Sequence, residues 1–168
     1  MTDLMSYIDR GGIIVYILLG INIFGFAVML WKLVIVSIAR SRTEKAAKNA
    51  LDFMAKNNSG FNKDSMYNAV EIEVSKLESG LSIVRTIATI APLLGLLGTV
   101  YGVLNSFDAI SEYGLGDPSI FSKGISIALI TTVAGLIVAI PHYVGYNYFV
   151  SVIANIELKL KKEILEKI

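Results

Sequence analysis

The sequence feature that most limits the fold lies within residues 83–107, IVRTIATIAPLLGLLGTVYGVLNSF. Between Thr86 and Tyr101 this stretch has no charged side chain, and it is long enough to cross a membrane as a helix, for which about 20 residues are needed. Small or hydroxyl residues recur in it at steps of three and four, so a helix would carry them on one narrow face. That face consists of Ala88, Pro92, Gly95, Thr99, Gly102 and Ser106. Such a helix needs lipid or apolar protein on its other faces, and close backbone contact or water on this one.

The composition also indicates a membrane protein. The 168 residues are 54% hydrophobic, with a mean hydropathy of +0.63, which is too apolar for an ordinary soluble domain. The net charge of +1 gives no reason to expect nucleic acid as a partner. Because the chain has no Cys and a single His, we expect no disulfide and no metal site. No nucleophile with a paired base and no phosphate-binding loop is visible, so we expect neither catalysis nor a cofactor.

Two further apolar runs complete a three-span pattern. The run at residues 12–39 is interpreted as an uncleaved membrane helix, because a signal peptide would have a basic start and a shorter apolar core. The run at residues 124–149 has a second small and polar face at the same spacing. That face consists of Gly124, Ala128, Thr132, Gly135, Ala139 and His142. We therefore expect an all-α membrane protein with transmembrane helices at 12–39, 83–107 and 124–149.

Polar segments separate and follow these spans. Residues 40–82 are expected to be helical with a turn at 57–60, and the second helix of this segment should continue unbroken from Ser65 to Phe107. Residues 108–123 have the composition of a loop. Residues 150–168 are expected to form an amphipathic helix. Its apolar face consists of Ile153, Ile156, Leu160 and Ile164.

The distribution of basic residues favours one orientation. Lys and Arg are concentrated in residues 40–85 and 150–168 and are scarce in 1–11 and 108–123. By the positive-inside rule, the first two segments should be cytoplasmic and the other two should lie outside. Basic side chains near the span ends should lie at the headgroups and bind acidic lipid, with a role only in orientation as an equal alternative. They are Lys32, Arg40, Arg42 and Arg85.

Thr99 and Thr132 are the most informative side chains, because each lies in the middle of a span on one of the small faces. A single membrane threonine usually bonds a carbonyl one turn back. Two of them at similar depth on matching faces favour a shared polar lining. Three helices cannot enclose a water-filled path, so this lining requires a homo-oligomer in which both faces point to a common axis.

Few groups inside the spans can carry a proton. No acidic side chain lies in any span, so a carboxylate that carries ions across must belong to another polypeptide. His142 can titrate, but it follows Pro141 towards the end of its span, and a neutral structural role is the better interpretation.

Two segments, TIAPLLGLLGTVYGVLNSF and GISIALITTVAGLIVAIPHYVGYN, resemble the signature spans of the ExbB/TolQ proton-channel family, relatives of the flagellar MotA stators. The resemblance implies a pentameric ring in the bacterial inner membrane, with residues 1–11 and 108–123 periplasmic. The second and third spans would line a pore that holds the helices of an ExbD-like or TolR-like dimer, whose Asp carries protons. Proton flow would then do mechanical work on a TonB-like protein for outer-membrane transport, or on a TolA-like protein in the TolQ branch.

The resemblance also assigns roles to single residues. Thr99 and Thr132 match the family's pore threonines, and Pro92 and Pro141 match its signature prolines. Ile127 departs from the pattern, because many relatives have Glu there; a mechanism that needs a ring carboxylate is therefore in doubt.

Several alternatives remain at this point. We favour an ExbB-like over a TolQ-like subunit, and a stator over a membrane scaffold whose small residues only pack helices. A flagellar stator would need a longer cytoplasmic domain than residues 40–82 provide. The sequence does not choose between H⁺ and Na⁺.

Overall fold

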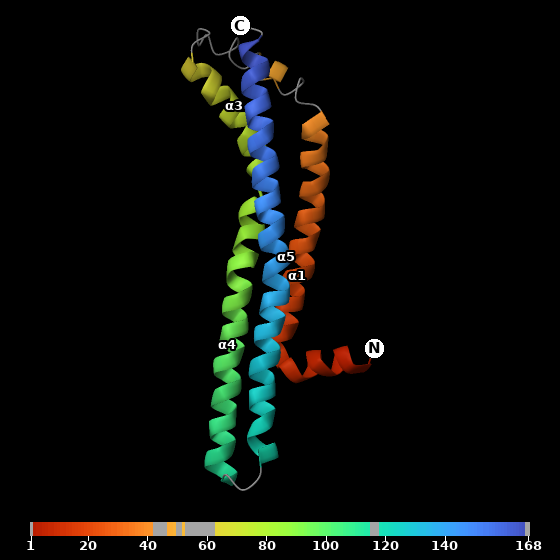
Figure 1. Cartoon of the computed structure of the whole chain (residues 1–168), viewed down its shortest axis with the longest axis vertical. Coiled ribbons are helices and arrows are strands. Elements are labelled where there is room, and N and C mark those ends of the chain that lie inside the picture. The colour runs from red at the N-terminus through yellow and green to blue at the C-terminus, as the bar shows by residue number, and fades with distance from the viewer. Residues whose placement is uncertain (1, 42–46, 50–51, 53–62, 115–117, 167–168) are drawn as a thin grey trace. The chain divides into compact units, whose positions relative to one another are not determined.

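The computed structural model describes residues 2–41, 47–49, 52, 63–114 and 118–166. Its main elements are the helices α1 (Thr2–Ser41), α3 (Lys63–Glu78), α4 (Leu81–Tyr113) and α5 (Pro118–Leu165) (Figure 1). The described residues include no β-strand. Stretches of α1, α4 and α5 are long and apolar enough to cross a membrane. The expected all-α fold with three candidate spans is confirmed.

The chain forms two compact units. Unit 1 consists of Met1–Ala27 and Ile83–Val144, and unit 2 of Val28–Ser82 and Gly145–Ile168. In unit 1, α4 and α5 lie side by side as an antiparallel pair, and α1 contributes Leu18 to their apolar core. The other buried members of this core are Ile87, Ala91, Val138 and Ala139.

Helix α1 changes direction at Gly12. The φ angle of Gly12 is 67°, a left-handed conformation that glycine adopts at little cost, and Figure 1 shows the first turns of α1 leaving the line of the rest. The hydroxyl of Tyr16 donates a hydrogen bond of 2.5 Å to Asp9 Oδ1 across this bend. Residues 2–11, expected outside the span, are therefore helical but separated from the apolar run by a bend.

The connection between α4 and α5 is shorter than the loop expected at residues 108–123. Helix α4 continues to Tyr113, where Gly114 has a φ of 79° and its N–H donates to the carbonyl of Ile110 at 2.8 Å. Helix α5 begins at Pro118, the first helical position that proline favours. Glycine and proline therefore cap the two helices and do not mark a long loop.

In unit 2, the apolar face of α3 packs against the last part of α5. Met66, Val70 and Val74 of α3 lie in one core with Phe149 of α5. The expected amphipathic helix after residue 149 is the continuation of α5, and its predicted apolar face is confirmed. Its four residues, Ile153, Ile156, Leu160 and Ile164, are all buried in this core.

The helix expected to run unbroken from Ser65 to Phe107 is interrupted at Gly80. Helix α3 ends at Glu78, the N–H of Ser79 donates to the carbonyl of Ser75 at 3.0 Å, and α4 starts at Leu81. The φ angle of Gly80 is 84°. The expectation was wrong because an isolated glycine can either continue a helix or end it in a left-handed turn.

Replacing Gly80 with alanine is expected to lower the free energy of unfolding by about 1 kcal/mol, because an L-residue is strained at positive φ. A Cβ at this position would lie 3.5 Å from Lys32 Cε, an ordinary contact, so strain in the backbone causes the loss. Thermal unfolding of the detergent-solubilised chain measures it. Ser79→Ala, an exposed neighbour, is the control, and an equal unfolding temperature for the two variants would contradict the assignment.

Lys32 corrects the expectation that its amine lies at the lipid headgroups. Its side chain is only 1% exposed, and Nζ donates a hydrogen bond of 2.9 Å to the carbonyl of Leu77. Leu77 lies in the last turn of α3, where carbonyls lack a donor within the helix and attract cations. Lys32 therefore ties α1 to the end of α3 inside unit 2.

Candidate functional site

The small faces of α4 and α5 pack against each other within one chain. A Cβ added to Gly102 would overlap the carbonyl oxygen of Gly124, and one added to Gly135 would lie 2.7 Å from the carbonyl oxygen of Ala91. A Cβ added to Gly95 would likewise lie only 2.9 Å from a backbone atom of α5, the carbonyl oxygen of Thr131. The two backbones can approach this closely only because these residues lack side chains.

Most of the residues expected to line a passage lie in this contact. Ala88, Gly95, Gly102, Ser106, Ala128, Gly135 and Ala139 are buried. Pro92, Thr99 and Thr132 are only partly buried. Each small face thus finds its partner on the neighbouring helix of the same chain, whereas the sequence analysis pointed both faces towards an axis shared by several copies. Periodicity reveals a small face but does not identify what the face contacts.

Thr99 and Thr132 form a hydroxyl pair at the edge of this contact. Their Oγ1 atoms are 2.6 Å apart, and either can be the donor. Thr99 Oγ1 also lies 3.1 Å from the carbonyl oxygen of Gly95, and Thr132 Oγ1 lies 3.2 Å from that of Ala128. A hydroxyl has one proton, so one threonine donates to the other while the second donates to a carbonyl. The pair can reverse this direction without moving a heavy atom.

Two further hydroxyl side chains lie in the contact between α4 and α5. Ser106 Oγ donates to the carbonyls of Gly102 at 3.1 Å and Phe121 at 2.9 Å, so it links the helices near their connection. Thr131, which the sequence analysis missed, is fully buried, and its side chain occupies the space that a Cβ on Gly98 would need. Its hydroxyl bonds the carbonyls of Ile127 and Ala128, each at 3.0 Å. The available sequence signal was Gly98, which follows Gly95 by three residues and precedes Gly102 by four, the same spacing that defines the small face.

His142 of α5 packs against Gly25 and Phe26 of α1. It lies ten residues beyond Thr132 and therefore about 15 Å further along α5. The ring is fully buried, and Nδ1 lies 2.7 Å from the carbonyl oxygen of Val138. Since a carbonyl can only accept, Nδ1 carries the proton. Among the described residues Nε2 has no hydrogen-bond partner, and the ring meets Phe26 edge-on at 5.2 Å. This environment fits the structural role that the sequence favoured.

The fit of His142 depends on Gly25, since a Cβ on Gly25 would overlap Nε2 of the imidazole. Gly25→Ala is expected to lower the free energy of unfolding by about 1–3 kcal/mol, the usual cost of overpacking. Adding His142→Ala should remove part of this loss, and thermal unfolding of the two single variants and the double variant measures the coupling. Gly20→Ala, on the same helix with nothing within 4 Å of its Cβ, is the control. Strict additivity of the two losses would contradict the contact.

The remaining basic residues have different positions. Arg85 is exposed on α4, and Arg40 is exposed at the end of α1. Arg42 lies outside the described residues. Binding of these three side chains to headgroups stays a prediction. For metal ions, the described residues contain no group of three or more His, Cys, Asp or Glu side chains that could hold one.

Fold and site define an α-helical membrane protein in which two glycine-rich spans join around a pair of hydroxyls. Residues 37–162 match the sequence model described as the MotA/TolQ/ExbB proton channel family, which is more than half of the chain. The chain therefore belongs to the MotA/TolQ/ExbB proton channel family, and the resemblance found in the sequence is confirmed.

Individual relatives carry names from both branches. The chain is 31% identical over 168 residues to an ExbB homolog named for biopolymer transport in Methanothermobacter thermautotrophicus, a match that covers 82% of this chain and 60% of that protein. It is 40% identical over 79 residues to the biopolymer transport protein ExbB of Pseudomonas putida, covering 47% of this chain and 24% of the relative. It is 38% identical over 81 residues to the Tol-Pal system protein TolQ of Pseudomonas aeruginosa, covering 48% of this chain and 35% of the relative. Each match thus covers less than two thirds of the relative's own length.

Proposed function

We propose that this chain is the ring-forming subunit of an ion-driven stator in the bacterial inner membrane. Copies assemble, as a pentamer according to the family resemblance, with residues 1–11 and the connection after α4 in the periplasm and the C-terminus in the cytoplasm. The role is transport and not catalysis. Family membership supports this proposal, and the hydroxyl pair of Thr99 and Thr132 is the observation that carries it.

The hydroxyl pair suits the wall of an ion passage. Gly95, Gly102 and Gly135 hold α4 and α5 together, so the pair lies at the edge of a rigid two-helix unit. Repeating that edge around an axis gives a wall of small side chains and hydroxyls, which can replace part of an ion's water shell without trapping it. Pro92, which is also partly exposed on α4, would belong to the same wall.

The charged carrier is expected to come from a partner. No acidic side chain lies in residues 12–39, 83–107 or 124–149, and Ile127 occupies the position where many relatives have Glu. A single-span ExbD-like or TolR-like protein with an Asp in its helix would supply the missing carboxylate. Proton flow through this pair of proteins would do work on a TonB-like protein for outer-membrane transport. Because a TolQ is about as similar as the ExbB proteins, a TolQ-like role with a TolA-like protein is the second candidate.

Complementation tests the proposal and separates the branches. The chain and its single-span partner are expressed in a strain that lacks its own ExbB-like and TolQ-like proteins. Uptake of an iron chelate that is restored and then abolished by a proton uncoupler supports the ExbB-like role, whereas restored envelope constriction supports the TolQ-like role. Failure of both, with the chains correctly inserted and assembled, would favour a scaffold without conduction.

A further inference from the structure

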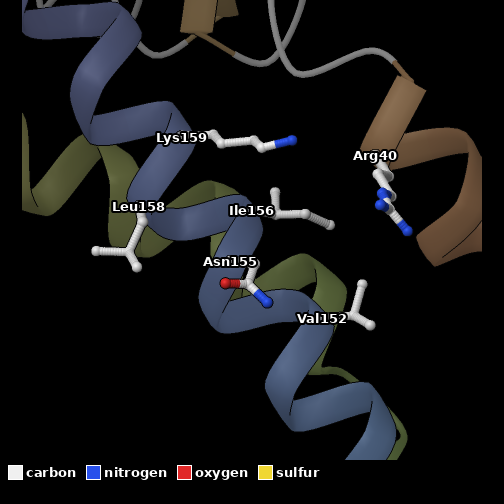
Figure 2. Close-up of a pocket in the computed structure, with 6 residues that line it drawn as sticks. All are labelled: Arg40, Val152, Asn155, Ile156, Leu158 and Lys159. Atoms are coloured by element: carbon white, nitrogen blue, oxygen red, sulfur yellow. The ribbon is translucent and has the colours of Figure 1, made fainter.

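A hollow of about 500 Å³ lies in unit 1, between α1 and α5. None of its described lining residues is charged, whereas Arg40 and Lys159 line the hollow of unit 2 that Figure 2 shows. Its polar lining residues are Tyr7 and Asn22 of α1. The exposed apolar residues that α5 contributes to its wall are Leu129, Val133 and Ile137. The chemistry of this hollow therefore suits the inside of a membrane.

Asn22 places an amide in this apolar wall. Its Oδ1 atom is buried, and no described residue donates a hydrogen bond to it. An amide has both donors and an acceptor, and a half-turn about its terminal torsion exchanges them. An unpaired amide is unfavourable in hydrocarbon, whereas a hydrogen bond between helices stabilises their association. Acyl chains have no hydrogen-bonding group, so the amide favours a polypeptide as the occupant of the hollow.

On α4, an exposed apolar surface adjoins the Thr99–Thr132 edge. Gly95 and Gly102, which contact α5, lie about 40–60° to one side of Thr99 around the helix. Three apolar residues lie about 60–120° to the other side, and all three are more than half exposed. These residues, called the α4 flank below, are Leu93, Leu96 and Val100.

On α5, the hollow adjoins the same edge. Gly135, which contacts α4, lies about 60° to one side of Thr132. The residues that α5 contributes to the hollow lie about 60–140° to the other side, and they too are more than half exposed. The Thr99–Thr132 edge therefore lies between the α4 flank and the hollow on the surface of unit 1.

This arrangement suits a closed ring, in which every interface joins two different surfaces of identical copies. When the Thr99–Thr132 edge of each copy faces a common axis, the α4 flank of one copy points towards the hollow of the next. The two surfaces also match in depth. Gly95 contacts Gly135, and the helices are antiparallel, so Leu93 and Ile137 lie at about the same depth in one chain. Rotation about an axis normal to the membrane preserves that depth in the neighbouring copy.

We propose that the hollow receives the α4 flank of a neighbouring copy of this chain, which also supplies a hydrogen-bond partner for Asn22. The proposal rests on the ring assembly in the proposed function, and it identifies the two surfaces that meet. A ridge of side chains that packs into a groove gives the close contact that holds helices together in a membrane.

Cross-linking between copies tests the proposal. The chain has no cysteine, so Leu93→Cys/Ile137→Cys introduces one thiol into the α4 flank and one into the hollow. In membranes treated with a short bifunctional thiol reagent, we expect this double variant to form a ladder of covalent oligomers. Each single variant should remain at the size of one chain, because the interface joins unlike surfaces. Leu93→Cys/Ile17→Cys is the control, since Ile17 is 48% exposed on α1 but does not line the hollow.

Native mass spectrometry of the same samples distinguishes the possible failures. Intact rings without a ladder, or an equal ladder in the control, would overturn the proposed interface and leave the ring in place. A chain that stays monomeric would contradict the ring assembly itself. Rings that cross-link as expected but do not conduct ions would support the interface and contradict the stator function.

Asn22→Leu provides a readout that needs no cysteine. The unfolding temperature of the single chain should not fall, because the amide has no acceptor contact to lose among the described residues. Ring assembly in detergent should require roughly threefold to tenfold more protein, the effect of losing one hydrogen bond between helices. Ile23→Leu, an exposed neighbour outside the hollow, should assemble as the unmodified chain does. Unchanged assembly of Asn22→Leu, or an equal loss in Ile23→Leu, would overturn the pairing of Asn22 with the neighbouring copy.

Discussion

Replacing Thr132 with valine is expected to reduce proton-driven activity of the assembled complex by at least about tenfold while the chain remains folded. Valine has nearly the shape of threonine but no hydroxyl, so the variant loses the 2.6 Å contact with Thr99 Oγ1. A hydrogen bond inside a membrane contributes only about 1 kcal/mol to stability, so the fold should tolerate the change. Without this hydroxyl, the wall has no group at that position to replace part of the ion's water shell, so the free-energy barrier to passage rises. A rise of about 1.4 kcal/mol in the barrier lowers the rate tenfold.

The measurement is proton flux into liposomes that contain the chain and its partner, together with the unfolding temperature of each variant. Thr89→Val is the matched control, because the hydroxyl of Thr89 is exposed on α4 and bonds the carbonyls of Arg85 and Thr86 in its own helix. Thr132→Ser restores a hydroxyl and should recover much of the flux. Unchanged flux in Thr132→Val, or an equal loss in Thr89→Val, would exclude a specific role for the pair.

Replacing Gly102 with valine is expected to destabilise the α4–α5 pair by about 3 kcal/mol, the upper part of the range for overpacking. A Cβ there would overlap the carbonyl oxygen of Gly124 and lie 2.7 Å from the backbone nitrogen of Ala128. These are backbone atoms, so the clash is relieved only if the helices separate. Separation would also pull Thr99, which lies one turn away on α4, from Thr132, and activity should be lost together with stability.

Thermal unfolding and limited proteolysis in detergent measure the effect of this substitution. Gly20→Val is the control, because a Cβ on Gly20 of α1 meets nothing within 4 Å. We expect Gly20→Val to unfold close to the temperature of the unmodified chain and Gly102→Val far below it. Similar unfolding temperatures for the two variants would show that the close approach of α4 and α5 is not what holds unit 1 together.

The sequence predicts much of this fold because its strongest patterns are local. An apolar run of about 20 residues can cross a membrane whatever its neighbours are, so the three candidate spans follow from length and composition. The burial of Ile153, Ile156, Leu160 and Ile164 follows in the same way, since a period of 3.6 residues places them on one face of a helix.

Features that depend on distant parts of the chain were missed. Lys32 follows an apolar run and lies next to Trp31, a pattern typical of a residue at the membrane–water interface. Its amine instead donates to the carbonyl of Leu77, 45 residues away. The small faces of α4 and α5 raise the same difficulty, because periodicity does not distinguish a face that meets a neighbouring helix from one that meets water. In contrast, Gly114 and Pro118 were available as local signals for a short connection and were interpreted as parts of a longer loop.

Accessibility to water tests the central claim most directly, namely that the edge formed by Thr99 and Thr132 faces an aqueous ion passage in the assembled ring. The chain has no cysteine, so Thr99→Cys and Leu97→Cys each introduce a single thiol into the same helix, with Leu97 among the exposed apolar residues of α4. Rings without the partner helix are treated in membranes with a small, charged thiol reagent that does not enter lipid. We predict that Thr99→Cys reacts and Leu97→Cys does not, whereas an unreactive Thr99→Cys, or a reaction confined to Leu97→Cys, would contradict the account.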